Sequence, residues 1–366
     1  MVRNRKEHLD LGMRSPGQKH EEVTIAIVNY NGRDILGDTI HSCLDQDYEA
    51  KRIIMVDDGS NDGSVEFVKS KFPEVVIIEM GGNTKNLNKV RNVALKNAKS
   101  SLVFLIDNDI VLGKGVLKIL VANINSENNV AICSPRLLYY TDPSKINMDV
   151  IQLHYLGTAV AYNRDAPLTE CVKYSVPQMK TGCGILLLKK QKVEEIGLFD
   201  EGYLMAWGDD GELYHRLQLA GYKCWHIPQA ICFHKTKEWS GARHFRAFGQ
   251  VYNRWRLIIT SYSTRTMVLC LPVLCVYDLL QLGFFFYKRF PSLYFKALYK
   301  LLKELSELRI RRKQIQKTRK VSDRQLLVSG PIYVSPYLMN NKLLSLFVLI
   351  TSYIFNAYWA MVKRAL

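Results

Sequence analysis

Residues 52–60, with the sequence RIIMVDDGS, decide the fold class of the chain. The apolar run predicts a strand that is buried on both faces, and acidic and turn-forming residues follow directly at its end. Segments of the same character alternate along the chain with segments that have helical spacing. This alternation predicts an α/β protein with a Rossmann-like, doubly wound sheet. The expected strands are 23–28, 52–56, 75–79 and 102–106, and the expected helices are 34–46, 63–71 and 86–99.

The alternation loosens after residue 130, where the connections between apolar segments become longer. We therefore expect a mixed central sheet, to which the second half of the globular part contributes. Ligands of doubly wound sheets bind beyond the carboxyl ends of the strands, and the polar clusters of this chain follow such ends. The later expected strands are 130–140, 151–162, 183–189 and 224–227, and the expected helix is 209–220.

The positive charge of the chain is concentrated in its C-terminal third. The whole chain has a net charge of +16, yet residues 23–250 contain 26 basic and 26 acidic residues, whereas residues 251–366 contain 19 basic and 4 acidic ones. Basic residues interspersed with Leu, Phe and Tyr favour an anionic membrane surface as the partner over nucleic acid. The eight cysteines are scattered without a CxxC pair, so they indicate reduced thiols and neither zinc ligation nor a disulfide framework.

Two apolar segments in this third are long enough to cross a bilayer. Residues 266–287 carry one charge, Asp278, and residues 343–362 carry none. Between them, residues 291–308 predict one helix with an apolar face that lies in the membrane interface. That face would be formed by Tyr294, Leu298, Leu301, Leu305 and Leu308.

The linker 288–342 contains 14 basic and 3 acidic residues, which opposes its transfer across a membrane. We therefore favour monotopic or re-entrant attachment through 266–287 and 343–362. A spanning hairpin and a buried helix pair of a soluble core are the alternatives. Residues 1–22 are polar and basic without the apolar core of a signal peptide, so we expect a loose tail and a globular part on the cytoplasmic side.

Three polar clusters follow the expected strands of the first half. Asp107 and Asp109 form a DxD pair whose carboxylates suit a hard cation such as Mg²⁺ or Mn²⁺ beside a diphosphate. Asp57 and Asp58 precede Gly59, and their carboxylates can accept hydrogen bonds from a base or a ribose. Acidic turns, an Asx-turn or a helix cap explain these clusters equally well. The third cluster could stack on a base and bind its edge, or be a polar turn; it consists of Asn29, Tyr30 and Asn31.

A later acidic cluster opens the helix expected at 209–220. Asp209, Asp210 and Glu212 favour the helix dipole at that position, which is a sufficient structural explanation. Because Trp207 precedes them in an aromatic loop, one of these carboxylates could also act as a general base. His234 follows an apolar strand and is either a structural histidine or a further metal ligand.

In order and spacing, these clusters resemble the family 2 glycosyltransferases of the GT-A fold. The resemblance covers about residues 23–260. The chain beyond it looks like the membrane-associated branch, rhamnosyl- and hexosyltransferases of surface polysaccharide and cell-envelope glycan synthesis. The matching segments are Tyr30-Asn31, DDGS at 57–60, Arg91-Asn92, the DxD motif, Gly182-Cys-Gly184, Gly197-Leu-Phe-Asp-Glu201, Trp207-Gly208-Asp209-Asp210, Arg216, His234 and Tyr252-Asn253-Arg254.

The resemblance implies a role for each matching position. Asp210 falls on the aspartate that acts as general base, although Asp209 stands where the family has Glu, which leaves open which carboxylate acts. Asp109 would bind the metal, and His234 would complete its shell. The nucleotide-sugar would be bound by Asp58 at the base, with Asp57 and Asn31 lining that pocket, by Arg91 near the nucleotide and by Asp107 at the ribose; Asn29, Tyr30 and Gly182 are further candidates.

The resemblance also implies the reaction and the domains. The enzyme would be an inverting, metal-dependent hexosyltransferase with a nucleotide-diphosphate sugar donor and a glycan or lipid-linked saccharide acceptor. A sugar nucleotidyltransferase is an alternative, but no glycine- and arginine-rich loop follows the first strand. A non-catalytic membrane-binding scaffold is the other. The expected parts are the tail 1–22, the nucleotide-sugar-binding half 23–130, the acceptor-binding half 131–250 and the membrane-attachment region 251–366.

Overall fold

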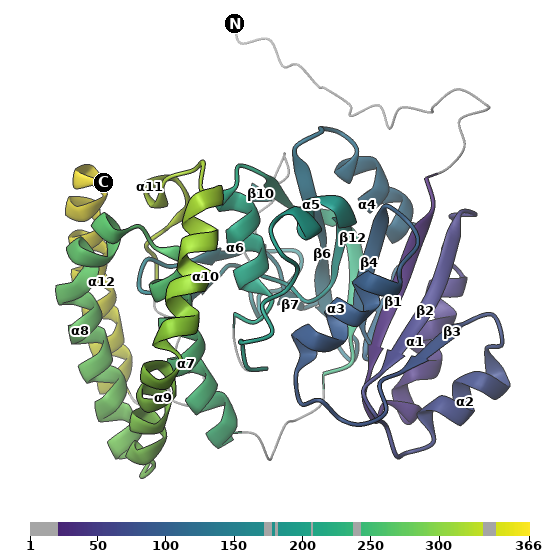
Figure 1. Ribbon diagram of the computed structural model, residues 1–366, viewed down its shortest axis with the longest axis horizontal. Helices are drawn as coiled ribbons and strands as arrows, with labels where there is room; N and C mark the ends of the chain where they lie inside the picture. The colour runs from purple at the N-terminus through teal and green to yellow at the C-terminus, as the bar shows by residue number, and fades with distance from the viewer. Residues whose placement is uncertain (1–20, 172–177, 180–181, 206–207, 237–242, 332–341) are drawn as a thin grey trace, which may run out of the picture.

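The computed structural model of the chain describes residues 21–171, 178–179, 182–205, 208–236, 243–331 and 342–366. Its central feature is a mixed sheet with the strand order β10-β12-β6-β11-β4-β1-β2-β3 (Figure 1). The first four strands are parallel, with β1 between β2 and β4. The inner segments of β1, β2 and β4 are buried on both faces, whereas β3 lies at the edge of the sheet and is partly exposed. These strands are β1 (Val23–Asn29), β2 (Lys51–Asp57), β3 (Val76–Glu79) and β4 (Leu102–Asp107).

The helices between these strands confirm the predicted alternation. The chain runs outward from β1 to β3 and then returns to β4, so right-handed crossovers place α1 and α2 on one face of the sheet and α3 on the other. Asn86 caps α3 by accepting a hydrogen bond from the Lys89 N–H at 3.1 Å. The helices are α1 (Arg33–Leu44), α2 (Ser64–Lys71) and α3 (Leu87–Asn97).

The second half makes the sheet mixed, as predicted. Strand β11 (Leu186–Lys189) is antiparallel to β4 on one side and to β6 (Val130–Tyr139) on the other. Strand β12 (Lys223–His234) then runs parallel to β6 and extends well beyond the predicted 224–227. The remaining elements of this half are β5 (Ile110–Leu112), β7 (Ile146–Met148), β10 (Gln178–Met179), α4 (Val116–Ile124), α5 (Lys190–Glu195) and α6 (Gly211–Leu219).

The prediction of one strand over 151–162 was wrong. The segment folds back on itself as a separate antiparallel pair, β8 (Ile151–Leu153) and β9 (Ala159–Ala161). The reversal depends on Gly157, which has φ +76° and whose position would bring a Cβ within 2.9 Å of Ile258. A residue with a side chain would therefore be both strained and obstructed there.

Helices beyond the sheet form a layer at one end of it (Figure 1). Helix α7 (Arg243–Ser261) packs against α9 and α10, and the predicted domain boundary at residue 250 falls inside it. Apolar side chains from Tyr155 and Tyr203 in the sheet-bearing part share one core cluster with this layer. The globular domain and the helices are therefore joined by a common core. The other helices are α8 (Thr264–Tyr287), α9 (Pro291–Lys303), α10 (Leu305–Thr318), α11 (Asp323–Leu326) and α12 (Lys342–Ala365).

The prediction of one interfacial helix over 291–308 also needs correction. The helix breaks at Glu304, whose carboxylate accepts a hydrogen bond from the Tyr252 hydroxyl of α7. Tyr294, Leu301 and Leu308 are buried against α7 and do not face outward. Helical spacing correctly identified an apolar face, but α7 supplies the apolar partner that covers it.

Candidate active site

The carboxyl ends of three adjacent strands bring the first predicted clusters to one edge of the sheet. Asn29 on β1 lies in register with Asp57 on β2, and Val28 lies in register with Asp107 on β4. Neighbouring strands are about 5 Å apart, so the ends of β2 and β4 are separated by about 10 Å across β1. The clusters at residues 29–31, 57–60 and 107–109 therefore border one site.

Asn29 and Asp57 hold the first two loops together. The Asn29 side-chain amide donates to the Asp57 carboxylate at 2.8 Å, and Ser60 donates to the same carboxylate through its backbone N–H at 2.8 Å and its hydroxyl at 2.7 Å. The side-chain amide of Asn108 in the DxD turn donates to the side-chain oxygen of Asn29 at 2.7 Å. The Asp57 carboxylate is thus occupied by the chain's own donors, and its direct effect is to fix the shape of the loops.

The neighbouring side chains are arranged differently. Asp58 is buried and accepts a hydrogen bond from the Thr84 N–H at 2.9 Å, which ties the loop after β3 to the site. Asn31 has φ +49° and accepts a hydrogen bond from the Asn61 N–H at 3.0 Å. Tyr30 is 46% exposed, so its ring is available to a ligand.

Asp109 and His234 form the predicted metal-binding pair. His234 ends β12, and its Nε2 lies 3.2 Å from the Asp109 carboxylate. Burial lowers the pKa of His234, but the hydrogen bond that its ring N–H donates to the Asp109 carboxylate and the negative charge of Asp109 outweigh burial and raise it. On its other side, His234 Nδ1 lies 2.9 Å from the Asn147 side-chain oxygen on β7. Asn147 thereby orients the imidazole toward Asp109.

Asp109 and His234 supply two of the ligands that a divalent cation needs, and the others would come from outside the protein. Oδ1 of Asp109 is buried and has no hydrogen-bond partner among the described residues. The part of the chain that the structure describes contains no group of three or more His, Cys, Asp or Glu side chains arranged to hold a metal. A carboxylate and an imidazole are enough for a cation that takes its other ligands from a substrate diphosphate and water. The residues therefore fit a metal that is shared with a substrate.

Arg91 connects the DxD motif to the later acidic cluster. Its guanidinium lies 3.1 Å from the Asp209 carboxylate and 3.8 Å from that of Asp107. Burial and the negative charge of Asp210 raise the pKa of Asp209 to about 7, against the opposing effect of Arg91. Burial likewise raises the pKa of Asp107, and Arg91 opposes it. The cluster is therefore short of positive charge and able to take up a proton or a cation.

Asp210 is the acidic residue of this group that is left free to act. It caps α6 by accepting a hydrogen bond from the Gly211 N–H at 2.7 Å, and it forms no ion pair with any described residue. Gly182, with φ +111°, packs beside it, so that a Cβ at residue 182 would lie 3.9 Å from the Asp210 carboxylate. The Asp210 side chain can therefore cap α6 and still offer its carboxylate to a substrate.

The remaining candidates lie outside this group. Glu212 is buried, accepts a hydrogen bond from the Asp200 N–H at 2.8 Å and pairs with Arg216, so it holds loop 198–205 to α6. Trp207 lies outside the described residues. The structure thus brings together Arg91, Asp107, Asp109, Asp209, Asp210, Gly182 and His234 at one edge of the sheet, next to the loops of Asn29, Tyr30, Asn31, Asp57 and Asp58.

Sequence analysis missed two asparagines at the site. Asn88 is buried and its amide donates to the backbone carbonyls of Asp200 at 3.0 Å and Asp209 at 2.8 Å. Asn147 orients His234, as described above. Asn88 lies one helical turn before Arg91 on α3, a spacing that could have identified it, whereas no sequence signal links Asn147 to a histidine 87 positions away.

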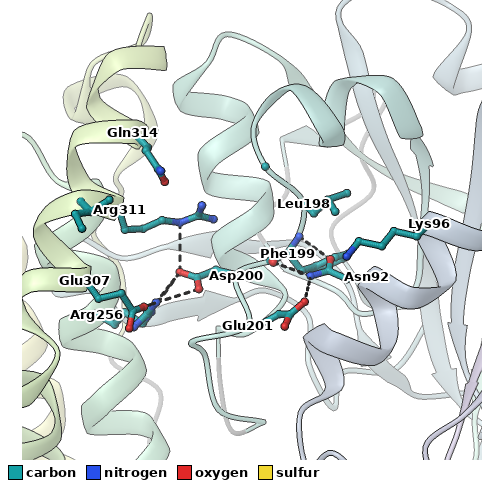
Figure 2. Close-up of a pocket in the computed structure, with 12 residues that line it drawn as sticks. Asn92, Lys96, Leu198, Phe199, Asp200, Glu201, Arg256, Glu307, Arg311 and Gln314 are labelled. Atoms are coloured by element: carbon teal, nitrogen blue, oxygen red, sulfur yellow. Dashed lines mark hydrogen bonds and ion pairs between the residues drawn. The ribbon is translucent and has the colours of Figure 1, made fainter. Parts of the chain in front are cut away.

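A separate cavity of about 420 Å³ lies behind loop 198–201, between α3, α7 and α10 (Figure 2). Asp200 is at its centre and accepts three hydrogen bonds of 3.0 to 3.2 Å from Arg256, with Arg311 3.5 Å away. Asn92 donates to the Phe199 carbonyl at 3.0 Å and to Glu201 at 2.8 Å. The residues that line this cavity therefore support loop 198–201. Asn88 links the same loop, at Asp200, to the backbone of Asp209.

Residues 24–174 match the model of glycosyl transferase family 2. This match covers less than half of the chain and shows a similarity to that family over this segment. Poly-beta-1,6-N-acetyl-D-glucosamine synthase of Staphylococcus aureus is 25% identical over 227 residues, which are 60% of this chain and 52% of that protein. The synthase of Staphylococcus epidermidis is 23% identical over 66% of this chain and 56% of its own length. The chain thus spans about half the length of these relatives.

Solved structures show the fold of the chain. A crystal structure of GalNAc-T7 with UDP, GalNAc and Mn²⁺ aligns with a TM-score of 0.53 at 17% identity, covering 67% of this chain and 48% of that one. A mannosyltransferase from Pyrobaculum calidifontis, in complex with GDP-Man and Mn²⁺, aligns with a TM-score of 0.51 at 15% identity, covering 93% of this chain and 88% of that one. The predicted GT-A fold, with helices after the mixed sheet, is confirmed.

Proposed function

We propose that the chain is an inverting, metal-dependent glycosyltransferase, which moves a sugar from a nucleoside diphosphate donor to a hydroxyl group of a glycan or lipid-linked saccharide. One observation carries the proposal. Arg91, Asp107, Asp109 and Asp210 come from three distant segments of a family 2 sequence and lie within electrostatic reach of one another at one edge of the sheet. A scaffold without catalytic activity would have no need for so many uncompensated carboxylates.

The donor would bind along the edge formed by β1, β2 and β4. Asp58 and Asn31 would contact the base, Tyr30 would stack on it, and Asp107 would meet the ribose. The diphosphate would lie near Arg91, and Asp109 with His234 would hold Mg²⁺ or Mn²⁺. That ion, when bound, supplies positive charge to the diphosphate leaving group. UDP and GDP-Man beside Mn²⁺ in the two fold relatives agree with this donor class.

Asp210 would act as the general base. The acceptor oxygen forms a bond to the anomeric carbon while the bond from that carbon to the diphosphate breaks, and the electron pair leaves with the phosphate. The proton of the acceptor hydroxyl passes to the Asp210 carboxylate. One displacement of this kind inverts the anomeric centre. Asp209 does not compete for this role because Arg91 holds its carboxylate at 3.1 Å.

We place this reaction at the cytoplasmic face of a membrane. Helices α8 and α12 are long and apolar enough to cross a bilayer by length and composition. The basic charge of residues 251–366 suits anionic headgroups. Attachment of this kind would bring a lipid-linked acceptor to the site.

The experiment is a screen of UDP- and GDP-sugars against the purified full chain with Mn²⁺ or Mg²⁺, read by thermal shift. A donor in 100-fold excess over its dissociation constant stabilises the native state by about 2.7 kcal/mol, which is readily measured. Removal of the metal with EDTA, or the variant Asp109→Asn, should abolish most of this stabilisation. The exposed carboxylate variant Asp142→Asn is the matched control. The proposal fails if no nucleotide sugar stabilises the protein.

The base is tested with the donor that the screen identifies. Asp210→Asn keeps the size of the side chain and an oxygen that can cap α6, but it cannot accept the proton. Release of nucleoside diphosphate in the presence of acceptor should fall by 10²-fold or more, while the thermal shift caused by the donor stays unchanged. Full transfer by Asp210→Asn would remove this residue from the role of base.

A further inference from the structure

Helix α8 has one covered face and one open face along its whole length. The covered face contains Cys270, Val273, Leu274 and Phe285, which are at most 5% exposed. The open face repeats every three or four residues, as expected of a continuous helical stripe. Its exposed residues are Val268, Leu271, Cys275, Leu279 and Phe286.

The covered face of α8 is held to the globular domain at its middle. Asp278, the only acidic residue of the helix, accepts hydrogen bonds from the Arg254 guanidinium at 2.5 Å, the Trp255 indole at 3.1 Å and the Tyr294 hydroxyl at 2.7 Å. Arg254 belongs to α7, and its side chain also donates to the Leu156 carbonyl at 3.2 Å. The midpoint of α8 is thus joined through one arginine to the hairpin of β8 and β9.

Helix α12 lies against the same part of the domain. The ring of Trp359 stacks on Tyr155, with 4.7 Å between the ring centres, and the Tyr155 hydroxyl donates to the Phe355 carbonyl at 2.8 Å. The Tyr358 hydroxyl donates to the Leu269 carbonyl of α8 at 2.6 Å. The opposite side of α12 is exposed and apolar. It presents Leu346, Phe347, Leu349, Ile350, Tyr353, Ile354 and Met361, all at least 50% exposed.

These contacts oppose a transmembrane orientation of α8. A bilayer centred on Asp278 would have to enclose α7, which donates Arg254, and α10, which lies beside α7 and carries the run Arg309–Lys313 with four basic residues. Placing these charged side chains at the centre of a bilayer would cost free energy. The exposed apolar faces of α8 and α12 can instead contact lipid from one side. A bilayer that runs parallel to both helices satisfies every observation.

The charge beside the open faces identifies the occupant. On α9, Phe295, Tyr299 and Leu302 are 52–63% exposed and lie next to the exposed Lys296 and Lys303. Residues 251–366 contain 19 basic and only 4 acidic residues. An exposed apolar surface rimmed by lysines is complementary to acyl chains under anionic headgroups.

We propose that the open faces of α8, α9 and α12 form a lipid-docking surface, on which α8 and α12 lie parallel to the plane of an anionic bilayer without crossing it. This surface consists of the exposed apolar residues named above with Lys296 and Lys303. The proposal rests on the membrane localisation proposed above, and it is independent of the transfer reaction.

Orientation is tested by labelling both ends of α8. Cys275 is the exposed one of the eight cysteines, so Cys275→Ser removes the reactive background. Arg265→Cys or Lys288→Cys is then added to the full chain, labelled with the fluorophore NBD, and bound to preformed vesicles of phosphatidylglycerol and phosphatidylcholine. External dithionite, which does not cross the bilayer, should bleach both labels completely. Protection of either label inside the vesicle would overturn the proposal.

The apolar contacts are tested by vesicle flotation. Leu271→Asn with Leu279→Asn should reduce binding by tenfold or more, because both exposed leucines lose their burial among the acyl chains. Val76→Asn, at a 49% exposed site on β3, is the matched control and should bind as the native chain does. Lys296→Gln with Lys303→Gln should weaken binding to anionic vesicles but not alter binding to purely zwitterionic ones. Unchanged binding in both double variants would overturn the proposal.

A readout of the donor site keeps the two proposals separate. The thermal shift caused by nucleotide sugar and Mn²⁺ should be the same in Leu271→Asn/Leu279→Asn as in the native chain, since both residues lie outside the donor site. Unchanged docking of this variant, with an intact donor response, would contradict the lipid-docking proposal alone. A native chain that docks on vesicles but shows no donor response would contradict the proposed function alone.

Discussion

The variant Arg256→Leu tests how far the helical layer stabilises loop 198–205. Arg256 is 1% exposed and binds Asp200, the Tyr252 hydroxyl at 3.1 Å and Glu307 at 2.7 Å (Figure 2). Burial alone raises the pKa of Asp200, but Arg256 and Arg311 reverse this and hold it below its ordinary value. The carboxylate therefore stays ionised because of these cations.

Removal of Arg256 leaves the Asp200 carboxylate buried with Arg311 as its remaining cation, 3.5 Å away. Breaking a buried ion pair in this way costs about 3–5 kcal/mol, and Arg311 keeps the expected loss near the lower value, about 3 kcal/mol. A chain of 366 residues gains roughly 0.8 kcal/mol/K of entropy on unfolding, so Tm should fall by roughly 4 °C. Differential scanning fluorimetry in detergent at pH 7.5 measures this shift.

The pH dependence makes the test specific. In the native chain, the lowered pKa of Asp200 contributes stability that is present above pH 4 and lost as the pH falls through the folded-state pKa. The variant lacks most of this contribution, so the difference in Tm should shrink as the pH falls below 4. Arg52→Leu, which removes a half-exposed pair with Glu22, is the control and should shift Tm by less than about 1 °C. A similar loss in both variants, or a loss independent of pH, would refute the reasoning.

Two further outcomes follow from the acidic cluster and its packing. Asp209 has a pKa raised to about 7, so the folded chain binds a proton more tightly than the unfolded chain, and stability should fall as pH rises from about 4 to 7. Urea unfolding without ligands should show this slope, and Asp209→Asn should flatten it; an unchanged slope would contradict the shift. Gly184→Ala places a Cβ 2.6 Å from Arg91 Nη2 and 3.3 Å from Asp107, so it should weaken donor binding measured by titration, with a stability loss of about 1–3 kcal/mol. Unaltered donor affinity in Gly184→Ala would contradict the role of Arg91 in donor binding.

The first half of the fold was predictable because local and global preferences agree there. The apolar runs at β1, β2 and β4 are strands because the sheet buries both of their faces, and each run ends where the predicted polar cluster begins. The register of Asn29 with Asp57 follows from parallel pairing of strands that end together. Sequence analysis could therefore bring these clusters to one edge of a sheet without knowledge of any contact.

What could not be predicted depends on partners that lie far away in the chain. Helical spacing marks the apolar face of residues 291–308, but only the packing of α7 shows that Leu301 points inward. The sequence does not distinguish Asp209 from Asp210, because the distinction depends on Arg91, which reaches Asp209 from a helix 118 positions earlier. The chain reversal at Gly157, which separates β8 from β9, depends in the same way on a distant residue, because Ile258 packs against this glycine.

The stacking of Trp359 on Tyr155 has a consequence for synthesis of the chain. The hydrogen bond from Tyr155 reaches Phe355, 200 residues later, and translation at about 5–20 residues per second takes roughly 10–40 s to make that segment. During this interval the apolar side of the β8–β9 hairpin has no α12 to cover it. The packing of this hairpin is therefore completed only after the last helix of the chain has been made.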